Sequence, residues 1–409
     1  MEKRAIQVFV GEKAILVGTA FFNGVGPRLR TTFTYASSWL GSRHSFALAP
    51  TAPLSSSSLQ FVGLPGFLSD AAPDRWGRRL IFRGAQGEAD RSHTAMRSLD
   101  DVDYLLGVDD WARMGALRFS RDEGQTFIGK GTDIPKIVRL PQLLTAARSV
   151  DAGTDEWRQL KSLLDVGSSS LGGARPKATV QDGRTLWLAK FPSVRDEWDV
   201  MTWEAWALIM ARRAGLKTPD IRVERVGEVS ILLSRRFDRA EQERIPYLSA
   251  LSALGLQDGA DADYLDLADV LLDSSDRPHG DIRELFARMV LSVALHNTDD
   301  HLRNHGFLQS GKGWRLSPVF DVNPCPFENE RRALSVMGTC SMGEEAQGLA
   351  AFAEAVGIDK SEARGIVQRV LDAFAYWQAV ARRVGCPQKE VNLFAPVIEK
   401  CSAKLTEQF

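Results

Sequence analysis

Short hydrophobic segments with strand-like alternation dominate the first third of the chain and predict a β-rich region. Ala5–Val10 and Ala14–Ala20 are β-prone and are separated by Gly11-Glu12-Lys13, which predicts a hairpin. Proline and serine in Thr51–Ser58 predict a surface loop. The other elements predicted here are the strands Leu29–Tyr35, Ser45–Leu48 and Ala116–Phe119 and the helices Trp76–Phe82 and Asp100–Leu106.

In the middle of the chain, predicted helices and strands alternate. Val200–Gly215 carries Trp203, Trp206 and Met210 at helical spacing and stops at a glycine, which is typical of a helix end. Further helices and paired strands are predicted on both sides of this helix. They are the helices Leu140–Ala147 and Asp155–Leu164 and the strands Ala178–Gln181, Thr185–Phe191, Ile221–Val226 and Val229–Leu233.

From about Ser249 onward the pattern becomes mostly helical. Asp281–Leu295 is strongly apolar and precedes a polar loop, and Phe307–Leu308 with Trp314–Leu316 predicts a small hairpin. The sequence therefore predicts an α+β chain with three regions. These are a β-rich N-terminal subdomain at residues 1–135, a small mixed lobe at 136–248 and a mostly helical lobe at 249–409.

The charges of the 409-residue chain nearly cancel, with 51 Lys and Arg against 52 Asp and Glu. A protein that grips nucleic acid along its whole length is strongly basic, so DNA contact here requires a local patch or a partner. No apolar stretch approaches the roughly 18 residues of a membrane helix, and the N-terminus lacks the apolar run of a signal peptide. The four cysteines lie in the last quarter without a close pair, so we expect reduced thiols in a cytoplasm.

The densest polar cluster, His296–Gly306, follows the apolar helix. In it, the spacing of Asp299 and Asn304 matches a kinase catalytic loop, where a carboxylate accepts the hydroxyl proton and an amide oxygen binds magnesium. Asp321, which follows a β-type run, comes in the order expected of a second magnesium ligand. The alternative is a solvated loop whose Asp and Asn residues only cap helices.

The same loop contains three histidines, His296, His301 and His305, which allow a second alternative, a zinc site. They match no common zinc spacing. The pair His301 and His305, at helical i, i+4 spacing, still needs a third ligand.

A candidate phosphate-binding lysine lies upstream of this loop. Lys190 ends the apolar β segment Thr185–Phe191, the position of the kinase lysine that holds nucleotide phosphates. Glu204, fourteen residues further on in a predicted helix, could pair with it. Each is an ordinary solvated residue when taken singly, but in the order Lys190, Glu204, Asp299, Asn304, Asp321 they support one another.

The loop Ser168–Lys177 combines serines, glycines and cations. Glycines let backbone N–H groups approach phosphate oxygens, and cations add charge, although the Walker spacing is absent. The residues predicted to contact a nucleotide here are Gly172, Gly173, Ala174, Arg175 and Lys177. An exposed serine of this loop could itself accept phosphate, and the alternative is a linker with ordinary turn residues.

With these motifs the chain resembles the HipA family of bacterial toxin serine/threonine kinases along nearly its whole length. The most specific segments are Ser170–Lys177, Arg236–Arg239, Asn297–Gly306 and Ser317–Asp321. Asp74–Arg78 and Met114–Phe119 also resemble the N-terminal subdomain of that family. The resemblance implies a β-rich N-terminal subdomain followed by a two-lobed protein-kinase-like domain with a mostly helical C-lobe.

The resemblance also implies roles in binding ATP and Mg2+. Asp299 is then the catalytic base, Asn304 and Asp321 hold magnesium, Lys190 contacts ATP phosphates, and Phe237 lies in the hinge that receives adenine. One departure is Arg235, where the family's prototype has an acidic residue. Backbone groups normally hold adenine there, so we expect this departure to matter little.

Regulation and partners follow from the same resemblance. Ser170 matches the serine that members of the family autophosphorylate. In the family, this phosphorylation ejects the loop that carries the serine and stops nucleotide binding. Ser168, two residues earlier, offers a second phosphoacceptor. The expected partner is a helix-turn-helix antitoxin of the HipB type, through which DNA is contacted, and the expected substrate is an aminoacyl-tRNA synthetase. The alternative is a nucleotide-binding co-repressor with little kinase turnover.

Overall fold

The structure is a computed structural model that describes residues 4–129, 134–154, 157–164, 173, 175–241 and 243–409. The chain divides into two compact units. The first comprises Met1–Arg195 and Arg225–Leu248, and the second comprises Asp196–Glu224 and Ser249–Phe409. The domain boundaries drawn from the sequence at residues 135 and 248 stay a prediction.

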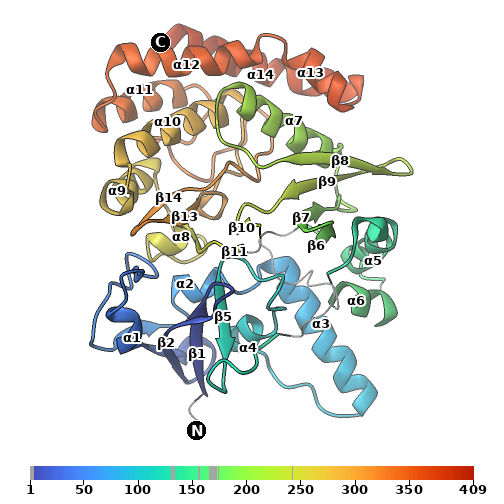
Figure 1. Ribbon diagram of the computed structural model, residues 1–409. Coiled ribbons are helices and arrows are strands. Elements are labelled where there is room, and N and C mark those ends of the chain that lie inside the picture. Colours follow the sequence, from blue (N-terminus) through green and yellow to red (C-terminus); the bar gives the residue numbers. More distant parts are fainter. Residues whose placement is uncertain (1–3, 130–133, 155–156, 165–172, 174, 242) are drawn as a thin grey trace. The chain divides into compact units, whose positions relative to one another are not determined.

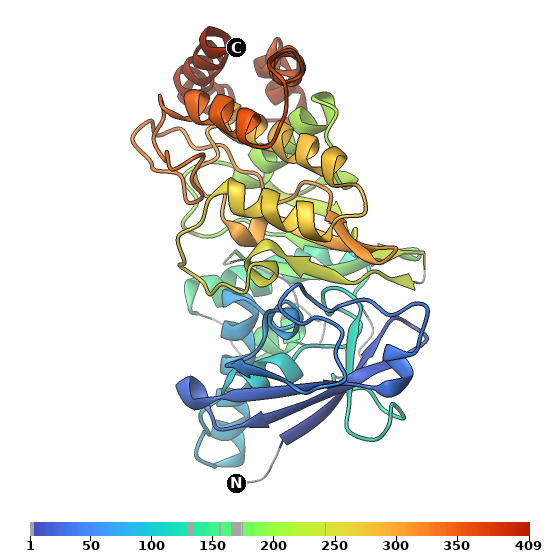
Figure 2. The same ribbon diagram turned by 90° about the vertical axis from the view of Figure 1, so that its left-hand side faces the viewer.

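The first unit begins with a five-stranded antiparallel sheet of order β4-β3-β2-β1-β5, drawn as a twisted layer in Figure 2. Side chains alternate between its faces, and Ile6, Val8 and Phe33 are among those that enter the core. Short helices and one long helix surround the sheet. The elements are β1 (Arg4–Val10), β2 (Ile15–Asn23), β3 (Arg30–Tyr35), α1 (Ser37–Leu40), β4 (Leu59–Val62), α2 (Gly66–Ser69), α3 (Arg75–Ser92), α4 (Asp101–Leu106) and β5 (Leu117–Ser120).

A second antiparallel sheet of the first unit carries candidate nucleotide-binding residues. Its strand β7 pairs with β6 on one side and β9 on the other. The elements of this region are α5 (Leu140–Ala152), α6 (Trp157–Leu164), β6 (Lys177–Asp182), β7 (Thr185–Lys190), β9 (Val229–Arg235) and the short pair β10 (Arg239–Ala240) and β11 (Glu243–Arg244). The strands β8 (Ile221–Val226) and β12 (Tyr247–Ser249) each cross a unit boundary along the chain.

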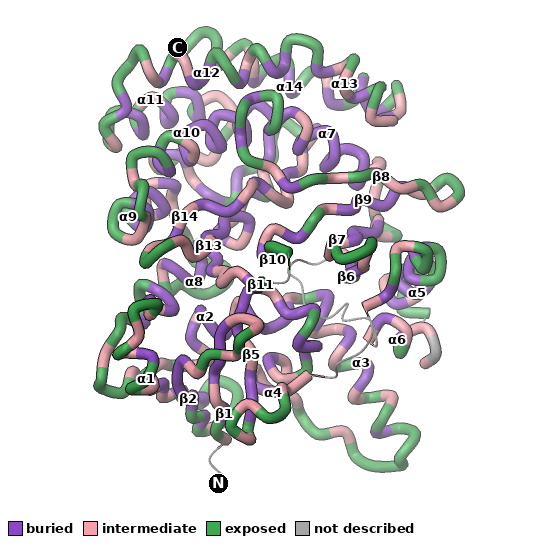
Figure 3. Tube along the Cα trace, in the orientation of Figure 1, coloured by how far each residue is buried: buried purple, intermediate pink, exposed green. Residues whose placement is uncertain are grey.

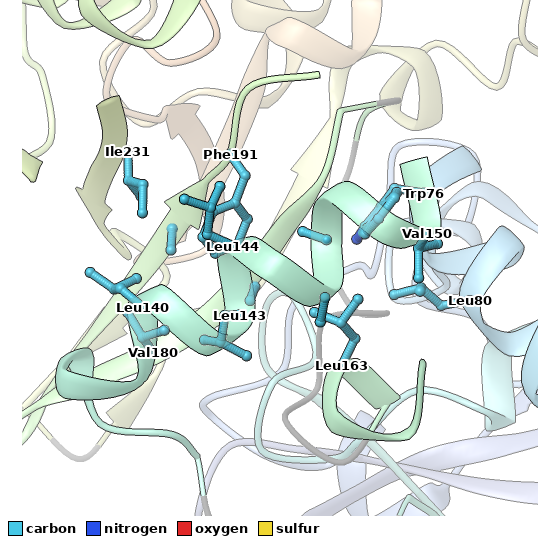
Figure 4. Packing of buried hydrophobic residues seen from close by; sticks show 14 of the residues in the cluster. Trp76, Leu80, Leu140, Leu143, Leu144, Val150, Leu163, Val180, Phe191 and Ile231 are labelled. Carbon is cyan, nitrogen blue, oxygen red and sulfur yellow. The ribbon is translucent and has the colours of Figure 1, made fainter. Parts of the chain in front are cut away.

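One hydrophobic cluster joins this sheet to α3 of the N-terminal subdomain. Leu140 and Leu144 of α5 pack against sheet residues such as Val180, while Trp76 and Leu80 come from α3 (Figure 4). The N-terminal subdomain and the second sheet therefore share a core.

The second unit is mostly helical, in agreement with the sequence (Figure 1). Its central helix α10 is buried from Leu285 onward and packs against α9, α11, α12 and α14 (Figure 3). The helices are α7 (Val200–Arg213), α8 (Ala250–Ala253), α9 (Tyr264–Ser274), α10 (Pro278–Ala294), α11 (Glu345–Ala355), α12 (Lys360–Phe374), α13 (Trp377–Val384) and α14 (Gln388–Gln408). The hairpin of β13 (Gly306–Ser310) and β14 (Gly313–Leu316) follows α10.

The predicted α+β fold class is confirmed, and most predicted elements are present within a few residues. The predicted strand Ser45–Leu48 is wrong, because these described residues form no strand. Their apolar side chains are buried by local contacts instead, since Phe46 packs edge-on against Trp39 and the Leu48 N–H donates to the Tyr35 hydroxyl. No helix in the described ranges has the length and hydropathy needed to cross a bilayer.

Candidate functional site

The loop after α10 presents Asp299 to solvent on a fixed backbone. The Asp299 side chain is exposed, whereas that of the adjacent Asp300 is buried. The Asn304 side-chain Nδ2 donates to the Asp299 carbonyl at 2.9 Å. This bond uses the amide nitrogen of Asn304 and does not involve the amide oxygen. An amide oxygen is a suitable ligand for a hard cation such as magnesium.

The neighbouring carbonyls of the same loop are also bound. Arg332 Nη1 donates to the Asn297 carbonyl at 2.9 Å, and the Ala333 N–H donates to the Thr298 carbonyl at 2.9 Å. Together with the bond to Asp299, consecutive carbonyls on the approach to the candidate base are therefore held in place.

Asp321 lies on a segment that is bonded to this loop at both ends. The Ser317 N–H donates to the Gly306 carbonyl at 2.8 Å, and the Cys325 N–H donates to the His296 carbonyl at 3.1 Å. Asp321 lies midway between these bonds and has a φ of +56°, the left-handed region that an aspartate adopts at a cost. Backbone strain of this kind clusters at functional sites, and a carboxylate is the oxygen ligand that magnesium prefers. Asn304 and Asp321 thus carry the kinds of oxygen that magnesium prefers, and their role as its ligands stays a prediction.

A buried polar network centred on Asp300 supports the loop from beneath. The Asp300 carboxylate accepts hydrogen bonds from the Tyr264 hydroxyl, from Ser292 Oγ at 2.6 Å and from His305 Nε2 at 2.9 Å. Burial acts to raise the pKa of Asp300, but His305 and Arg332 outweigh it and hold that pKa well below its ordinary value. Asp300 is therefore ionised and structural, whereas Asp299 is exposed.

Arg332 extends this network to α11. Its Nε donates to Glu345 Oε1 at 2.8 Å and its Nη1 donates to Ser292 Oγ at 2.7 Å. Burial opposes the charge of Arg332, but Glu345 and Asp300 raise its pKa above the ordinary value. Breaking one member of such a buried charge network leaves another charge without its partner, which costs several kcal/mol. The network was not foreseen from the sequence; its only signals were the doubled aspartate and a serine within an apolar helix.

Two candidate phosphate-binding lysines lie side by side in the first unit. Lys177 of β6 is directly opposite Lys190 of β7 in the strand register, and the two are only 3% and 6% exposed. Directly opposed residues of an antiparallel pair have Cβ atoms about 5 Å apart, and like charges there repel. The register thus places the two lysine side chains on the same face of the sheet.

Gly173 brings the end of the serine-glycine loop close to one of these lysines. Its φ is +98°, and a Cβ added to it would lie 2.5 Å from Lys177 Nζ. The backbone angle therefore favours glycine at this position, and a Cβ there would displace the flexible end of the Lys177 side chain.

The other candidate residues are placed as follows. Glu204 is buried on α7 of the second unit, so its predicted pairing with Lys190 of the first unit stays a prediction. Arg175 and Phe237 are half-buried in the first unit, and Arg235 is exposed at the end of β9. The predictions for Ser168, Ser169, Ser170, Gly172 and Ala174 lie outside the described residues.

Two of the three histidines of the loop have separate environments. His296 Nε2 bonds the Phe327 carbonyl at 3.0 Å, and burial lowers the pKa of its imidazole. His305 is bonded to Asp300 instead. No group of three or more His, Cys, Asp or Glu suited to a metal ion occurs among the described residues, so the zinc interpretation is wrong.

Comparison with known proteins matches two family models and similar solved structures. Residues 7–120 match the HipA N-terminal domain, and residues 169–377, half of the chain, match the HipA-like C-terminal domain. A similar structure, described as the Shewanella oneidensis MR-1 toxin–antitoxin complex of HipA, HipB and operator DNA, has 15% identity and a TM-score of 0.71, covering 98% of this chain and 97% of that chain. A further match is the Helicobacter pylori proinflammatory kinase CtkA, with 14% identity and a TM-score of 0.38, covering 57% of this chain and 94% of that chain. The two family models, which together reach from the first sheet to the helices of the second unit, show that the chain belongs to the HipA family.

Proposed function

We propose that this protein is an ATP- and magnesium-dependent serine/threonine protein kinase and the toxin of a toxin–antitoxin pair. The observation that carries the proposal is the clamped loop, in which the carbonyls of Asn297, Thr298 and Asp299 are bound while the Asp299 carboxylate is exposed. A catalytic base for an incoming hydroxyl must be both accessible and fixed in position. Membership of the HipA family supports the same reading.

In the proposed reaction, Asp299 orients the substrate hydroxyl and accepts its proton as the hydroxyl oxygen attacks the terminal phosphorus of ATP. The bond from that phosphorus to the bridging oxygen of ADP breaks, and the phosphoryl group stays on the substrate. Asn304 and Asp321 supply oxygens for magnesium, which neutralises charge on the phosphate oxygens when bound. Lys190 and Lys177 bind further phosphate oxygens.

The proposal includes self-regulation within Ser168–Ser170. A phosphate adds about −1.5 to −2 charges at neutral pH. Arg175 and Lys177 lie close by along the chain and would be drawn to it, leaving ATP with fewer cations. If Ser170→Ala loses no self-labelling and gains no persistence of activity, the phosphoacceptor is another residue.

The partner and the substrate are also proposed. The similar Shewanella structure is named as a complex with HipB and operator DNA, and a net charge of −1 agrees with DNA contact made through such an antitoxin. We propose an antitoxin of the HipB type, an aminoacyl-tRNA synthetase as substrate, and action in the cytoplasm.

A nucleotide-binding co-repressor with little turnover is the alternative function. Such a protein has no use for a proton acceptor, so an exposed and clamped carboxylate argues against it.

Incubation of the full chain with labelled ATP and magnesium separates the two functions. A kinase should incorporate phosphate, and this incorporation should be lost in Asp299→Asn although that variant retains its affinity for ATP. Incorporation by the wild type should also be lost in the presence of a chelator. Asp273→Asn, at an exposed position on α9, is the matched control and should label like the wild type. ATP binding without incorporation in the wild type would favour the co-repressor.

A further inference from the structure

The segment that carries Phe237 is held by a buried charge cluster centred on Asp238. This carboxylate is fully buried and accepts from Arg236 Nη2 at 2.6 Å, from Arg239 Nη1 at 2.6 Å and from the Gly115 N–H at 2.8 Å. Burial acts to raise the pKa of Asp238, but Arg236 and Arg239 outweigh it and lower that pKa to about 2. The aspartate is therefore ionised at neutral pH and bonded to both arginines.

The same arginines bind main-chain carbonyls of a loop in the N-terminal subdomain. Arg236 donates to the carbonyls of Ala112 at 2.6 Å and Arg113 at 2.9 Å. Arg239 donates to the carbonyls of Arg113 at 2.8 Å and Gly115 at 3.0 Å. The residues on either side of Phe237 are thus attached to residues 112–115 by charge-assisted hydrogen bonds, which are stronger than neutral ones.

The 112–115 loop is itself rigid. The Arg113 side chain is buried and its guanidinium donates to the carbonyls of Ala71, Leu105 and Val108. Gly115 has a φ of +73°, and a Cβ added to it would lie 3.1 Å from the Tyr247 nitrogen. A side chain at residue 115 would therefore crowd the backbone of Tyr247.

A second carboxylate of the N-terminal subdomain, Asp74, holds the end of the serine-glycine loop. Asp74 Oδ2 accepts from the Gly173 N–H at 2.6 Å, and the Trp76 N–H donates to the Gly173 carbonyl at 3.3 Å. Trp76 Nε1 also donates to the Lys177 carbonyl at 3.1 Å. The first turn of α3 therefore fixes both Gly173 and the strand residue that carries a candidate phosphate-binding side chain.

We propose that the N-terminal subdomain is a structural part of the nucleotide site, with Asp238 as the positioning residue for the adenine side and Asp74 as the positioning residue for the phosphate side. This proposal rests on the proposed kinase function, since it assigns Phe237 to adenine and Gly173 and Lys177 to phosphate. Neither carboxylate touches the nucleotide; each acts through the backbone that it holds.

The test measures the affinity of the full chain for Mg-ATP by titration and for Mg-tripolyphosphate by competition. Asp238→Asn is expected to weaken Mg-ATP by about tenfold or more, the scale of one lost charge-assisted hydrogen bond, and to leave Mg-tripolyphosphate within about twofold. Asp74→Asn is expected to weaken both ligands by about tenfold. A purely structural role would not separate the two ligands in this way.

Controls keep the test decisive. Arg4→Ala removes a different ion pair of the N-terminal subdomain, that with Asp100 at 2.6 Å, and should change neither affinity. Asp238→Asn leaves buried arginines without their carboxylate, which could prevent folding. Arg239→Lys therefore provides a second variant, which keeps the positive charge but loses the pair of hydrogen bonds from the guanidinium to the carbonyls of residues 113 and 115. The proposal is overturned if Asp74→Asn and those of Asp238→Asn and Arg239→Lys that fold all bind Mg-ATP within twofold of Arg4→Ala. It is also overturned if Asp238→Asn or Arg239→Lys weakens the binding of both ligands equally. A wild type that binds no Mg-ATP would instead refute the proposed function.

Discussion

Removing the Tyr264 hydroxyl tests how much the buried network beneath the candidate loop contributes to stability. Tyr264 is fully buried, and its hydroxyl donates to the ionised Asp300 carboxylate, so Tyr264→Phe deletes one hydrogen bond to a charge and leaves the ring in place. Hydrogen bonds to charged groups contribute roughly 1.5–3 kcal/mol. Asp300 keeps Ser292 and His305 as donors, so we expect the free energy of unfolding to fall by about 2 kcal/mol at neutral pH.

The assay is urea unfolding followed by tryptophan fluorescence, with Tyr376→Phe as the matched control. Tyr376 is 72% exposed, and its substitution should change stability by less than about 0.5 kcal/mol. In an Asp300→Asn background, Tyr264→Phe should cost less than in the wild type, because the charge that receives the bond is gone. A cost for Tyr264→Phe no larger than that of the control would refute the reasoning.

The pH dependence of the same pair has a definite sign. The folded-state pKa of Asp300 is lowered, so its ionised bonds contribute stability that is fully present above its unfolded pKa of about 4. That contribution is lost as the pH falls below this value through the folded pKa. The difference between wild type and Tyr264→Phe should therefore be constant from about pH 6 to 8 and shrink in acid.

Further predictions concern separate parts of the chain. Gly173→Ala should weaken Mg-ATP binding in a titration, because a Cβ would meet Lys177 Nζ and alanine disfavours a φ of +98°; wild-type affinity would contradict this. Glu390→Gln should destabilise the second unit by about 1 kcal/mol in urea, since the carboxylate accepts from Trp203 Nε1 at 2.8 Å and a neutral amide accepts more weakly; an unchanged midpoint would count against this. Cys401 should react with iodoacetamide at pH 8 far more slowly than the half-buried Cys325, because burial raises the pKa of the Cys401 thiol to about 12. Peptide mass spectrometry measures the labelling, and equal labelling of the two cysteines in the folded protein would contradict this prediction.

Local signals were sufficient to predict much of the fold. The hairpin of β1 and β2 and the hairpin of β13 and β14 were predicted because glycines at their turns interrupt β-prone segments. The candidate loop could be located because Asp299 and Asn304 have the spacing of a kinase catalytic-loop motif, which is visible within a short stretch of sequence.

Features that depend on distant residues could not be predicted. The helix α3 continues ten residues beyond the predicted end at Phe82, through Gly84 and Gly87, which ordinarily weaken a helix. The glycines are accommodated because a Cβ on Gly84 would lie 2.7 Å from Leu164 and one on Gly87 would lie 2.5 Å from Trp157, so α6 needs them for close approach. A local pattern contains no information about this neighbour.

The doubled aspartate shows the same limit within the site. From the sequence, Asp299 and Asp300 are equivalent in type, and only the spacing to Asn304 favours the first. The structure distinguishes them by the donors from Tyr264 and Ser292, which bury the second. Which aspartate faces solvent is therefore decided in part by helices that precede the loop.

The shared core of the first unit has a consequence for synthesis of the chain. Its members come from α3, α5, α6 and the strands β6, β7 and β9, so the cluster is complete only once Ile231 and Leu233 have been synthesised. A nascent chain released from the ribosome before β9 emerges would carry apolar helix faces with nothing to cover them, a typical cause of aggregation. Truncation within residues 190–230 should therefore yield insoluble fragments, whereas release of the chain beyond β11 allows this half to complete its folding.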